Sequence, residues 1–255
     1  MKVRVIGCHG GVAPDYQTSC YYVNDRFLVD CGSACSVLTP KEQNEITDIF
    51  ITHPHLDHIK DICFILENTF GPQREQLNLR STPEILDDVH KHMLNNVIWP
   101  DFSVIPCNPE KDRFILGFEP INQQVQLDDM TIRPFRVNHP GHAVGYVVEQ
   151  NGEHVVFTGD SGPCAEIWKQ ANSCSNLKAI FTEITFPSRM EGLAKASGHF
   201  TLEQLMDDYA LLQNKNVPIF ISHFKPAFLE ELLEEFQKLA PDQFKVMHED
   251  DIIDL

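Results

Sequence analysis

Short apolar runs alternate with amphipathic stretches along the whole chain. In the first third, residues 3–8, 19–24 and 26–30 have the β-branched and aromatic content that is typical of strands. Asn24-Asp25, between the second and third of these runs, is a typical hairpin turn. The pattern therefore predicts a β-meander near the beginning of the chain.

The rest of the chain continues to alternate strands and helices. Strands are expected at 130–137, 144–150, 154–158, 179–183, 218–222 and 244–248. Apolar residues at helical spacing predict helices at 59–70, 83–98, 201–213 and 227–239, with Thr201 as an N-cap. Residues 99–109 are proline-rich, aromatic and irregular, which indicates a surface loop packed by its own aromatic rings, with a segment that covers a pocket as the alternative. We expect an α/β fold with two packed β-sheets covered by helices.

The composition fits a single folded domain over residues 1–255. Of the 255 residues 42% are hydrophobic, and no linker-like stretch divides the chain. The chain has no run of about 18 apolar residues, and its first residues resemble a short strand and not a signal peptide. We therefore expect a cytoplasmic protein that does not associate with a membrane.

The net charge of −17 bears on the choice of partner. The chain has 37 acidic residues against 20 Lys and Arg, without a basic stripe. Proteins that bind nucleic acid neutralise phosphates with clustered basic residues, so nucleic acid is not an expected partner. A small anionic substrate is compatible with this charge, because it responds mainly to the charges lining its own pocket.

The segment His53-Pro54-His55-Leu56-Asp57-His58 is the strongest candidate for chemistry. It follows an apolar run and offers three imidazoles and one carboxylate, which transition metals bind at about 2.0–2.2 Å. In an extended segment, His53 and His55 point to the same side. The turn that follows can direct Asp57 and His58 toward a second position. The motif therefore indicates half of a two-metal hydrolytic site.

Three further candidates, His139, Asp160 and His223, follow later apolar runs. Polar residues that follow strands in this way converge at one edge of a sheet. They can therefore complete the ligand set that the first motif begins. His142 competes with His139 for one of these positions, and the residues alone leave this choice open.

Together these residues resemble the metallo-β-lactamase superfamily over nearly the whole chain. The resemblance implies a four-layer αββα sandwich, in which two mixed β-sheets are flanked by helices and metals lie at one edge of the sheets. It also implies two divalent transition-metal ions, with Asp160 bridging them. The first ion would be bound by His53, His55 and His139, and the second by Asp57, His58 and His223.

Two details of this resemblance refine the ligand set. In the ribonuclease Z and phosphodiesterase branches, the third histidine lies six residues before a Gly-aromatic pair, as His139 does before Gly145-Tyr146. His142 would then be a neighbouring loop residue. Lactamases of the zinc type have a cysteine where Asp160 stands, and an aspartate is similar to the phosphodiesterase and glyoxalase branches. Zinc is the expected metal, although manganese or iron suits the same donors.

Two later segments, 181–186 and 197–201, are similar to ribonuclease Z motifs. The similarity implies that His199 is the catalytic acid and is paired with Glu183. Such a pair suits phosphodiester cleavage, because the departing alkoxide must be protonated. The chain departs from the family where the first motif usually continues with Gly-Leu, since Asp61-Ile62 stands there. It also has no equivalent of the basic arm that ribonuclease Z uses for transfer RNA.

The chain most resembles bacterial class II-like cyclic-nucleotide phosphodiesterases, through segments 7–11, 158–163 and 222–226. This resemblance implies hydrolysis of a small cyclic nucleotide, 3',5'-cyclic AMP to 5'-AMP, by a metal-activated hydroxide with His199 as general acid. Asp57 would orient the nucleophile, and Arg189 would contact the phosphate. The resemblance also implies a homodimer.

Other functions use the same ligands. A ribonuclease Z-like RNA-processing endonuclease is one alternative. A thioester or lactone hydrolase of the same fold is another, and it would not need the pair of Glu183 and His199. A third alternative is a metal-binding protein without catalysis, which predicts bound metal and no ester hydrolysis.

Overall fold

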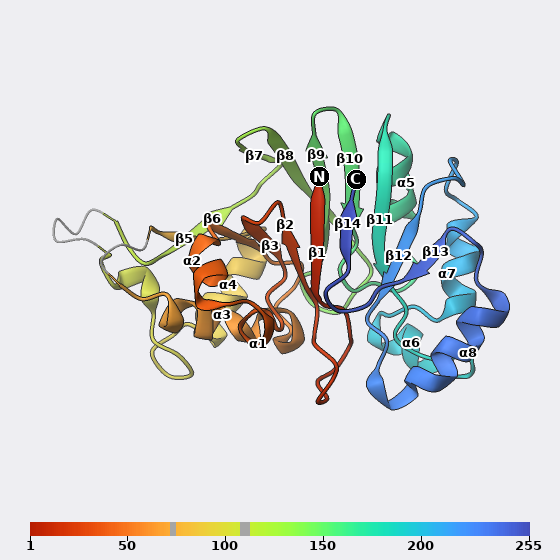
Figure 1. Ribbon diagram of the computed structural model, residues 1–255, viewed down its shortest axis with the longest axis horizontal. Coiled ribbons are helices and arrows are strands. Elements are labelled where there is room, and N and C mark those ends of the chain that lie inside the picture. Colours follow the sequence, from red (N-terminus) through yellow and green to blue (C-terminus); the bar gives the residue numbers. More distant parts are fainter. Residues whose placement is uncertain (72–74, 108–112) are drawn as a thin grey trace. The chain divides into compact units, whose positions relative to one another are not determined.

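The computed structural model describes residues 1–71, 75–107 and 113–255 (Figure 1). The chain forms two compact units. The first unit comprises Met1–Gly7, Gln17–Asn122 and Glu249–Asp254, and the second comprises Cys8–Tyr16, Gln123–His248 and Leu255. Each unit contains one seven-stranded sheet. The single domain expected over residues 1–255 stays a prediction.

The sheet of the first unit has the strand order β14-β1-β2-β3-β4-β5-β6. The strands are β1 (Lys2–Gly7), β2 (Cys20–Val23), β3 (Phe27–Val29), β4 (Asp48–Phe50), β5 (Leu77–Ser81), β6 (Leu116–Pro120) and β14 (Ile252–Asp254). The pairs from β14 to β3 are antiparallel, and those from β3 to β6 are parallel. Asn24 and Asp25 have φ values of 50° and 52°, which confirms the predicted hairpin turn between β2 and β3.

Helices of the first unit follow the β3, β4 and β5 strands. They are α1 (Ala34–Val37), α2 (Pro40–Glu45), α3 (Leu56–Asn68), α4 (Pro83–His92) and the 3₁₀ turn η1 (Phe102–Val104). The helix expected over 83–98 ends at His92, because Asn96 adopts a φ of 62° and Asn95 accepts hydrogen bonds from the N–H groups of Val97 and Ile98. A turn replaces the last part of the expected helix.

The irregular segment expected at 99–109 is described as far as residue 107. The ring of Trp99 lies 5.5 Å from that of Phe64, and the ring of Phe102 lies 6.3 Å from that of Phe70. The segment therefore packs its aromatic rings near α3. Residues 108 and 109 lie outside the described residues, and a covering role stays a prediction.

The sheet of the second unit has the strand order β13-β12-β11-β10-β9-β8-β7. The strands are β7 (Val125–Leu127), β8 (Met130–Arg136), β9 (Val144–Gln150), β10 (Glu153–Phe157), β11 (Leu177–Glu183), β12 (Ile219–Ser222) and β13 (Phe244–Val246). The pairs from β13 to β10 are parallel, and those from β10 to β7 are antiparallel. The carboxyl ends of β8, β10, β11 and β12 therefore lie at one edge of this sheet.

Helices also accompany the second sheet, and Figure 1 shows α5 beside β11. They are α5 (Ala165–Ser173), α6 (Glu191–Ser197), α7 (Leu202–Tyr209) and α8 (Leu229–Leu239), with 3₁₀ turns η2 (Ser188–Met190) and η3 (Pro226–Phe228). Thr201 caps α7 in a capping box with Gln204, as expected from the sequence. Sequence patterning missed α5, whose buried Trp168 packs in the core of this unit.

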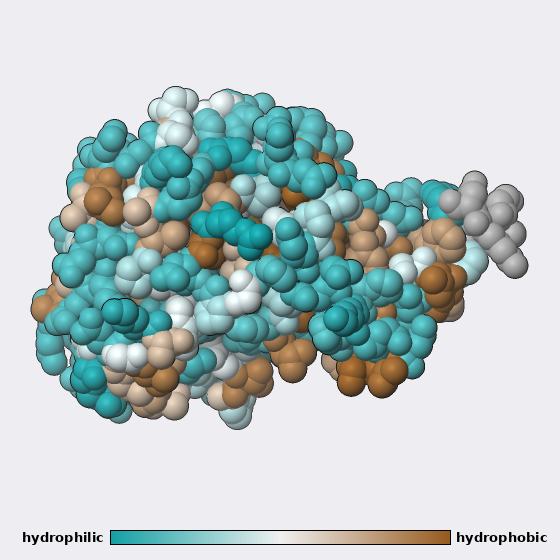
Figure 2. Space-filling view, turned by 180° about the vertical axis from the view of Figure 1, so that it is seen from behind, coloured by the Kyte–Doolittle hydropathy of each residue, from teal (hydrophilic) through white to brown (hydrophobic). Residues whose placement is uncertain are grey.

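The predicted fold class is confirmed, since the chain has two mixed β-sheets of seven strands flanked by helices. In the part of the chain that the structure describes, no helix has both the length and the apolar character needed to cross a membrane. On the face in Figure 2, hydrophilic residues predominate and hydrophobic ones form small separate groups.

Gly32 allows the loop after β3 to approach the beginning of α3. A Cβ atom at Gly32 would overlap the carbonyl oxygen of Asp57 and lie 2.6 Å from Thr18 Oγ1. Gly32→Ala must displace these atoms, so we expect the free energy of unfolding to fall by about 1–3 kcal/mol, measured by urea denaturation. Gly71→Ala is the control, because a Cβ there meets nothing within 4 Å. Equal losses in both variants would contradict this explanation.

Candidate metal centre

The residues predicted to bind metal are divided between the two units. The first unit contains His53, His55, Asp57 and His58, and the second contains His139, Asp160 and His223. Both sets offer imidazole nitrogens and carboxylate oxygens, the donors that divalent transition metals prefer. Each set is held by its own network of hydrogen bonds.

In the first unit, the histidines follow β4 and lead into α3. His55 is the N-cap of α3, and Asp57 and His58 lie in its first turn. Nε2 of His53 lies 3.0 Å from Nδ1 of His55. Two nitrogen ligands of one tetrahedral zinc ion are about 3.3 Å apart when each Zn–N bond is about 2.0–2.1 Å. The spacing of this pair therefore fits ligands of a shared ion.

Asp30 orients His58, and the sequence did not single it out. It is buried, follows β3 and has a φ of 58°. Its carboxylate accepts hydrogen bonds from Nδ1 of His58 at 2.7 Å and from the N–H of Thr52 at 2.8 Å. An acidic residue directly after an apolar run was the available signal, the same kind of signal that identified Asp160.

Thr52 extends this network to His53. Its hydroxyl donates to Asp30 at 2.8 Å and lies 3.1 Å from Nδ1 of His53. Because the hydroxyl gives its only proton to Asp30, Nδ1 of His53 must donate to it. His53 and His58 therefore both carry a proton on Nδ1 and a lone pair on Nε2, the form in which imidazole binds metal.

In the second unit, His139 and Asp160 follow β8 and β10. Ligand atoms of His139, Asp160 and His199 all lie within 4.8 Å of one another. Nδ1 of His139 donates to the carbonyl oxygen of Gly198 at 2.8 Å. Burial lowers the pKa of His139, which favours the neutral imidazole that a metal needs. His142 is half-buried, and the choice of His139 over His142 as the ligand stays a prediction.

The predicted pair of His199 and Glu183 is formed in the structure. Nδ1 of His199 lies 2.7 Å from Oε1 of Glu183, at the end of β11. Burial opposes the charged form of His199, but the adjacent Glu183 carboxylate and, further away, Asp160 outweigh it and raise the pKa of His199. Glu183 also accepts the N–H of Ser161 at 3.1 Å. The pair therefore favours a protonated imidazole.

Thr185 connects this pair to His223, and the sequence did not identify it either. Its hydroxyl donates to Oε2 of Glu183 at 2.6 Å and lies 2.8 Å from Nδ1 of His223. Nδ1 of His223 must therefore be the donor to Thr185. Nε2 then carries the lone pair, and it lies 3.2 Å from Oδ2 of Asp160. A lone threonine after a strand gave no signal that could have found it.

Arg189, the predicted phosphate contact, lies in η2 and is exposed. Its Nε and Nη2 atoms donate to the carboxylate of Glu231 at 2.7 and 2.8 Å. Its guanidinium carbon lies 5.9 Å from the ring centroid of Phe228. Glu231 thus binds the edge of the guanidinium that a phosphate would use, and the substrate contact stays a prediction.

Asp61, where the chain departs from the family motif, is buried within α3. Its Oδ2 accepts the N–H of Cys35 at 2.7 Å, and its Oδ1 lies 3.3 Å from Nζ of Lys60. The carboxylate therefore joins α3 to α1 and is balanced by a neighbouring cation. This explains how a charged residue is accommodated one turn after the ligands.

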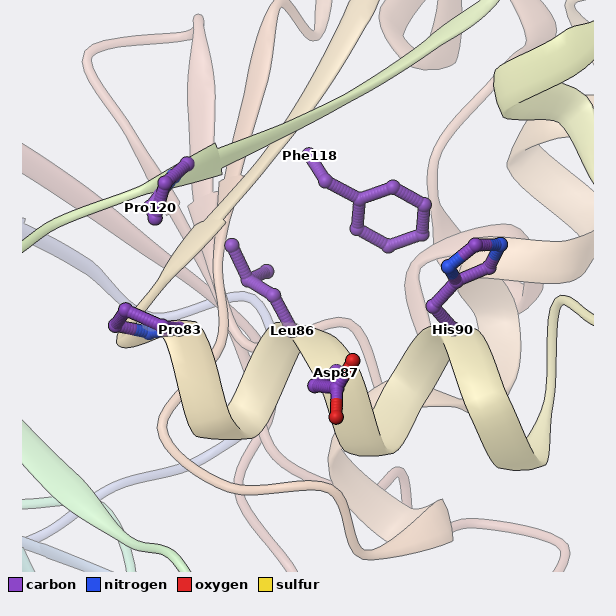
Figure 3. Close-up of a pocket in the computed structure, with 6 residues that line it drawn as sticks. All are labelled: Pro83, Leu86, Asp87, His90, Phe118 and Pro120. Atoms are coloured by element: carbon purple, nitrogen blue, oxygen red, sulfur yellow. The ribbon is translucent and has the colours of Figure 1, made fainter.

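A pocket of about 250 Å³ lies between α4 and β6 of the first unit (Figure 3). Figure 3 shows Leu86 rising from α4 and the ring of Phe118 extending from β6. The ring of His90 lies 4.8 Å from that of Phe118, and its Nε2 lies 2.9 Å from Asp101. The pocket is lined by Pro83, Leu86, Asp87, His90, Phe118 and Pro120. None of the predicted ligands or catalytic residues lines it.

The two helix-flanked sheets and the histidine and aspartate clusters after their strands define a protein of the metallo-β-lactamase fold, which implies divalent metal ions. The family model of the beta-lactamase superfamily domain matches residues 25–248. The chain therefore belongs to the beta-lactamase superfamily.

Curated relatives include a cyclic-nucleotide phosphodiesterase and a tRNase Z. The 3',5'-cyclic-nucleotide phosphodiesterase 1 of Saccharomyces cerevisiae is 30% identical over 95 residues, which are 37% of this chain and 25% of that protein. The chloroplastic tRNase Z TRZ2 of Arabidopsis thaliana is 24% identical over 226 residues, covering 75% of this chain and 61% of that protein. The matches thus span less than two thirds of each of these relatives.

Solved structures share the fold over the whole chain. The structure of unliganded yeast PDE1 has a TM-score of 0.79 and 18% identity, and covers 100% of this chain and 99% of that one. The short form of human tRNase Z has a TM-score of 0.69 and 15% identity, and covers 100% of this chain and 99% of that one. At these identities the likeness establishes the fold.

The role of Asp30 predicts a loss of metal affinity in an isosteric variant. Asp30→Asn replaces one carboxylate oxygen with an NH₂ group. Because both oxygens of Asp30 accept hydrogen bonds, from Thr52 and His58, the NH₂ group would face another donor. We expect about 10- to 100-fold weaker zinc binding, measured by competition with a chromophoric chelator. Asp87→Asn, exposed on α4 and without a side-chain hydrogen bond in the described part of the chain, is the control. Unchanged zinc affinity in Asp30→Asn would show that Asp30 does not orient a ligand.

Proposed function

We propose that the protein is a metal-dependent phosphodiesterase that hydrolyses a small cyclic nucleotide, 3',5'-cyclic AMP to 5'-AMP. The hydrogen bond of 2.7 Å between His199 and Glu183 is the observation that carries this proposal. It favours a protonated imidazole near Asp160, whose Oδ2 lies 4.0 Å from Nδ1 of His199. An acid in this position suits a substrate with an alkoxide leaving group.

The proposed ligand set follows the sequence motifs. His53, His55 and His139 would bind one ion, and Asp57, His58 and His223 the other, with Asp160 between them. The tautomers required by the hydrogen bonds of Asp30 and Thr185 support these assignments. Bound ions, for which we propose zinc, would lower the pKa of a water molecule and neutralise charge on the phosphoryl oxygens.

The residues of the chain have separate tasks in the proposed reaction. Glu183 accepts the Nδ1 proton of His199, so Nε2 is the atom that can give a proton to the departing ribose oxygen. The raised pKa of His199 favours the form that carries this proton. Asp57 would orient the attacking water from the first turn of α3. A homodimer and a cytoplasmic location are further parts of the proposal.

Charge favours a small substrate over RNA. The excess of 37 acidic over 20 basic residues would repel a polyanion, whereas a cyclic nucleotide presents one phosphate. RNA cleavage is the second candidate, because the tRNase Z relative matches 75% of this chain. The cyclic-nucleotide relative matches a shorter part at 30% identity.

A substrate panel separates these candidates. We expect the zinc-loaded protein to hydrolyse cyclic AMP and cyclic GMP faster than linear dinucleotides, a pre-tRNA, a lactone or a thioester. Initial rates and metal content should be measured on one preparation, with the chelator-treated protein as control. Faster cleavage of the pre-tRNA would favour the RNA-processing endonuclease. Hydrolysis of the lactone or thioester alone would contradict the proposed phosphodiesterase function.

Two variants separate the acid from the ligands. His199→Ala should lower kcat by about 10²- to 10⁴-fold and leave the metal content unchanged, because it removes the proton donor and no ligand. Asp160→Ala should lower the metal content itself, since it removes the proposed bridge. Metal analysis and steady-state kinetics on both variants test this. Loss of metal from His199→Ala would make His199 a ligand.

A further inference from the structure

The N-terminal segment Cys8–Gly11 lies against the loop that carries His223. The N–H of His223 donates to the carbonyl oxygen of Cys8 at 2.6 Å, and the N–H of Gly10 donates to that of Phe224 at 3.1 Å. His9 and Phe224 form a parallel bridge. The segment thus continues strand-like pairing beyond the end of β12, within the second unit.

His223 has an unusual backbone conformation that its surroundings must maintain. Its φ is 66°, in the left-handed region that residues with a Cβ rarely occupy. Such a conformation costs about 1–3 kcal/mol and persists only when neighbouring contacts hold it. The backbone hydrogen bond to Cys8 is one such contact, and it lies next to the proposed ligand side chain.

Gly10 brings the segment into contact with the imidazole of His223. A Cβ atom at Gly10 would lie 2.7 Å from Nδ1, 2.8 Å from Cε1 and 2.6 Å from the carbonyl oxygen of His223. These separations are too short for any side chain. Glycine is therefore required here for close approach, and the backbone of Gly10 limits how the ring can move.

Lys225 also contacts the N-terminal segment, through the backbone of Gly10. Its Nζ donates to the carbonyl oxygen of Gly10 at 2.7 Å, and it lies 5.8 Å from the ring centroid of Phe186. Lys225 is only two residues after His223 and is half-buried. Its side chain therefore joins the loop that carries His223 to the segment that contacts the ring.

We propose that Gly10 and Lys225 are positioning residues for His223, which hold its imidazole so that Nε2 remains directed toward a divalent metal ion. This proposal rests on the proposed function, in which His223 is a ligand. It gives a role to two sequence segments, 7–11 and 222–226. In the proposed reaction only His223 of these segments has a role. Thr185 holds Nδ1 of the ring, and the Gly10 backbone limits its rotation.

The test measures zinc binding to chelator-stripped protein by competition with a chromophoric chelator. Lys225→Met keeps a long side chain but removes the donor to Gly10, so we expect about 10- to 100-fold weaker binding of one ion. Lys225→Arg keeps a donor and should restore most of this affinity. Lys238→Met, an exposed substitution on α8, is the control and should bind zinc like the wild type.

Gly10→Ala directly tests the close approach of the Gly10 backbone to the ring of His223. We expect it to weaken zinc binding at least as much as Lys225→Met does. Circular dichroism establishes whether this variant folds, and Lys225→Met decides the question if it does not. Wild-type zinc affinity in Lys225→Met overturns the proposal. A raised KM for the cyclic nucleotide with unchanged zinc affinity also overturns it, because Lys225 would then contact the substrate.

These measurements distinguish failure of the proposed function from failure of the positioning role of Gly10 and Lys225. If the wild type binds zinc but hydrolyses no cyclic nucleotide, the proposed substrate is wrong, while weaker zinc binding in Lys225→Met still supports the positioning role. If the wild type binds no divalent ion, both proposals fail. The metal measurement therefore tests Gly10 and Lys225 independently of turnover.

Discussion

Hydrogen bonds that take the Nδ1 proton of histidine are the interactions on which the site depends. In the first unit Asp30 and Thr52 accept these protons, and in the second unit Glu183 and Thr185 accept them. In each unit a threonine hydroxyl gives its own proton to the carboxylate and so acts as the acceptor for a histidine. Each histidine then presents Nε2, either with a lone pair for metal or with a proton for transfer.

These networks depend in turn on strand ends in which the backbone is strained. Asp30 follows β3 with a φ of 58°, and His223 follows β12 with a φ of 66°. Each strand is flanked on at least one side by a parallel neighbour, whose hydrogen bonds fix where the strand ends. The sheet contacts thus offset the cost of left-handed conformations at polar residues, a cost of about 1–3 kcal/mol each.

Most strands were predictable because alternating or continuous apolar runs reflect burial in a sheet, as at 144–150, where the expected and observed bounds agree. Helix ends were harder to predict, because hydrogen bonds between side chains and the backbone can end a helix early. The helix expected over 83–98 stops early because Asn95 and Asn96 form a turn. Hydrophobic periodicity does not register competition of this kind between side chain and backbone.

The candidate ligands were predictable as a motif, but the residues that orient them were not. Asp160 and Asp30 both follow apolar runs, and no local pattern separates a carboxylate that faces a metal from one that accepts an imidazole proton. The difference appears only in the fold, where Asp30 is saturated by donors from Thr52 and His58. A carboxylate saturated in this way has little capacity left for a cation. The donors around Asp30 therefore assign it an orienting role.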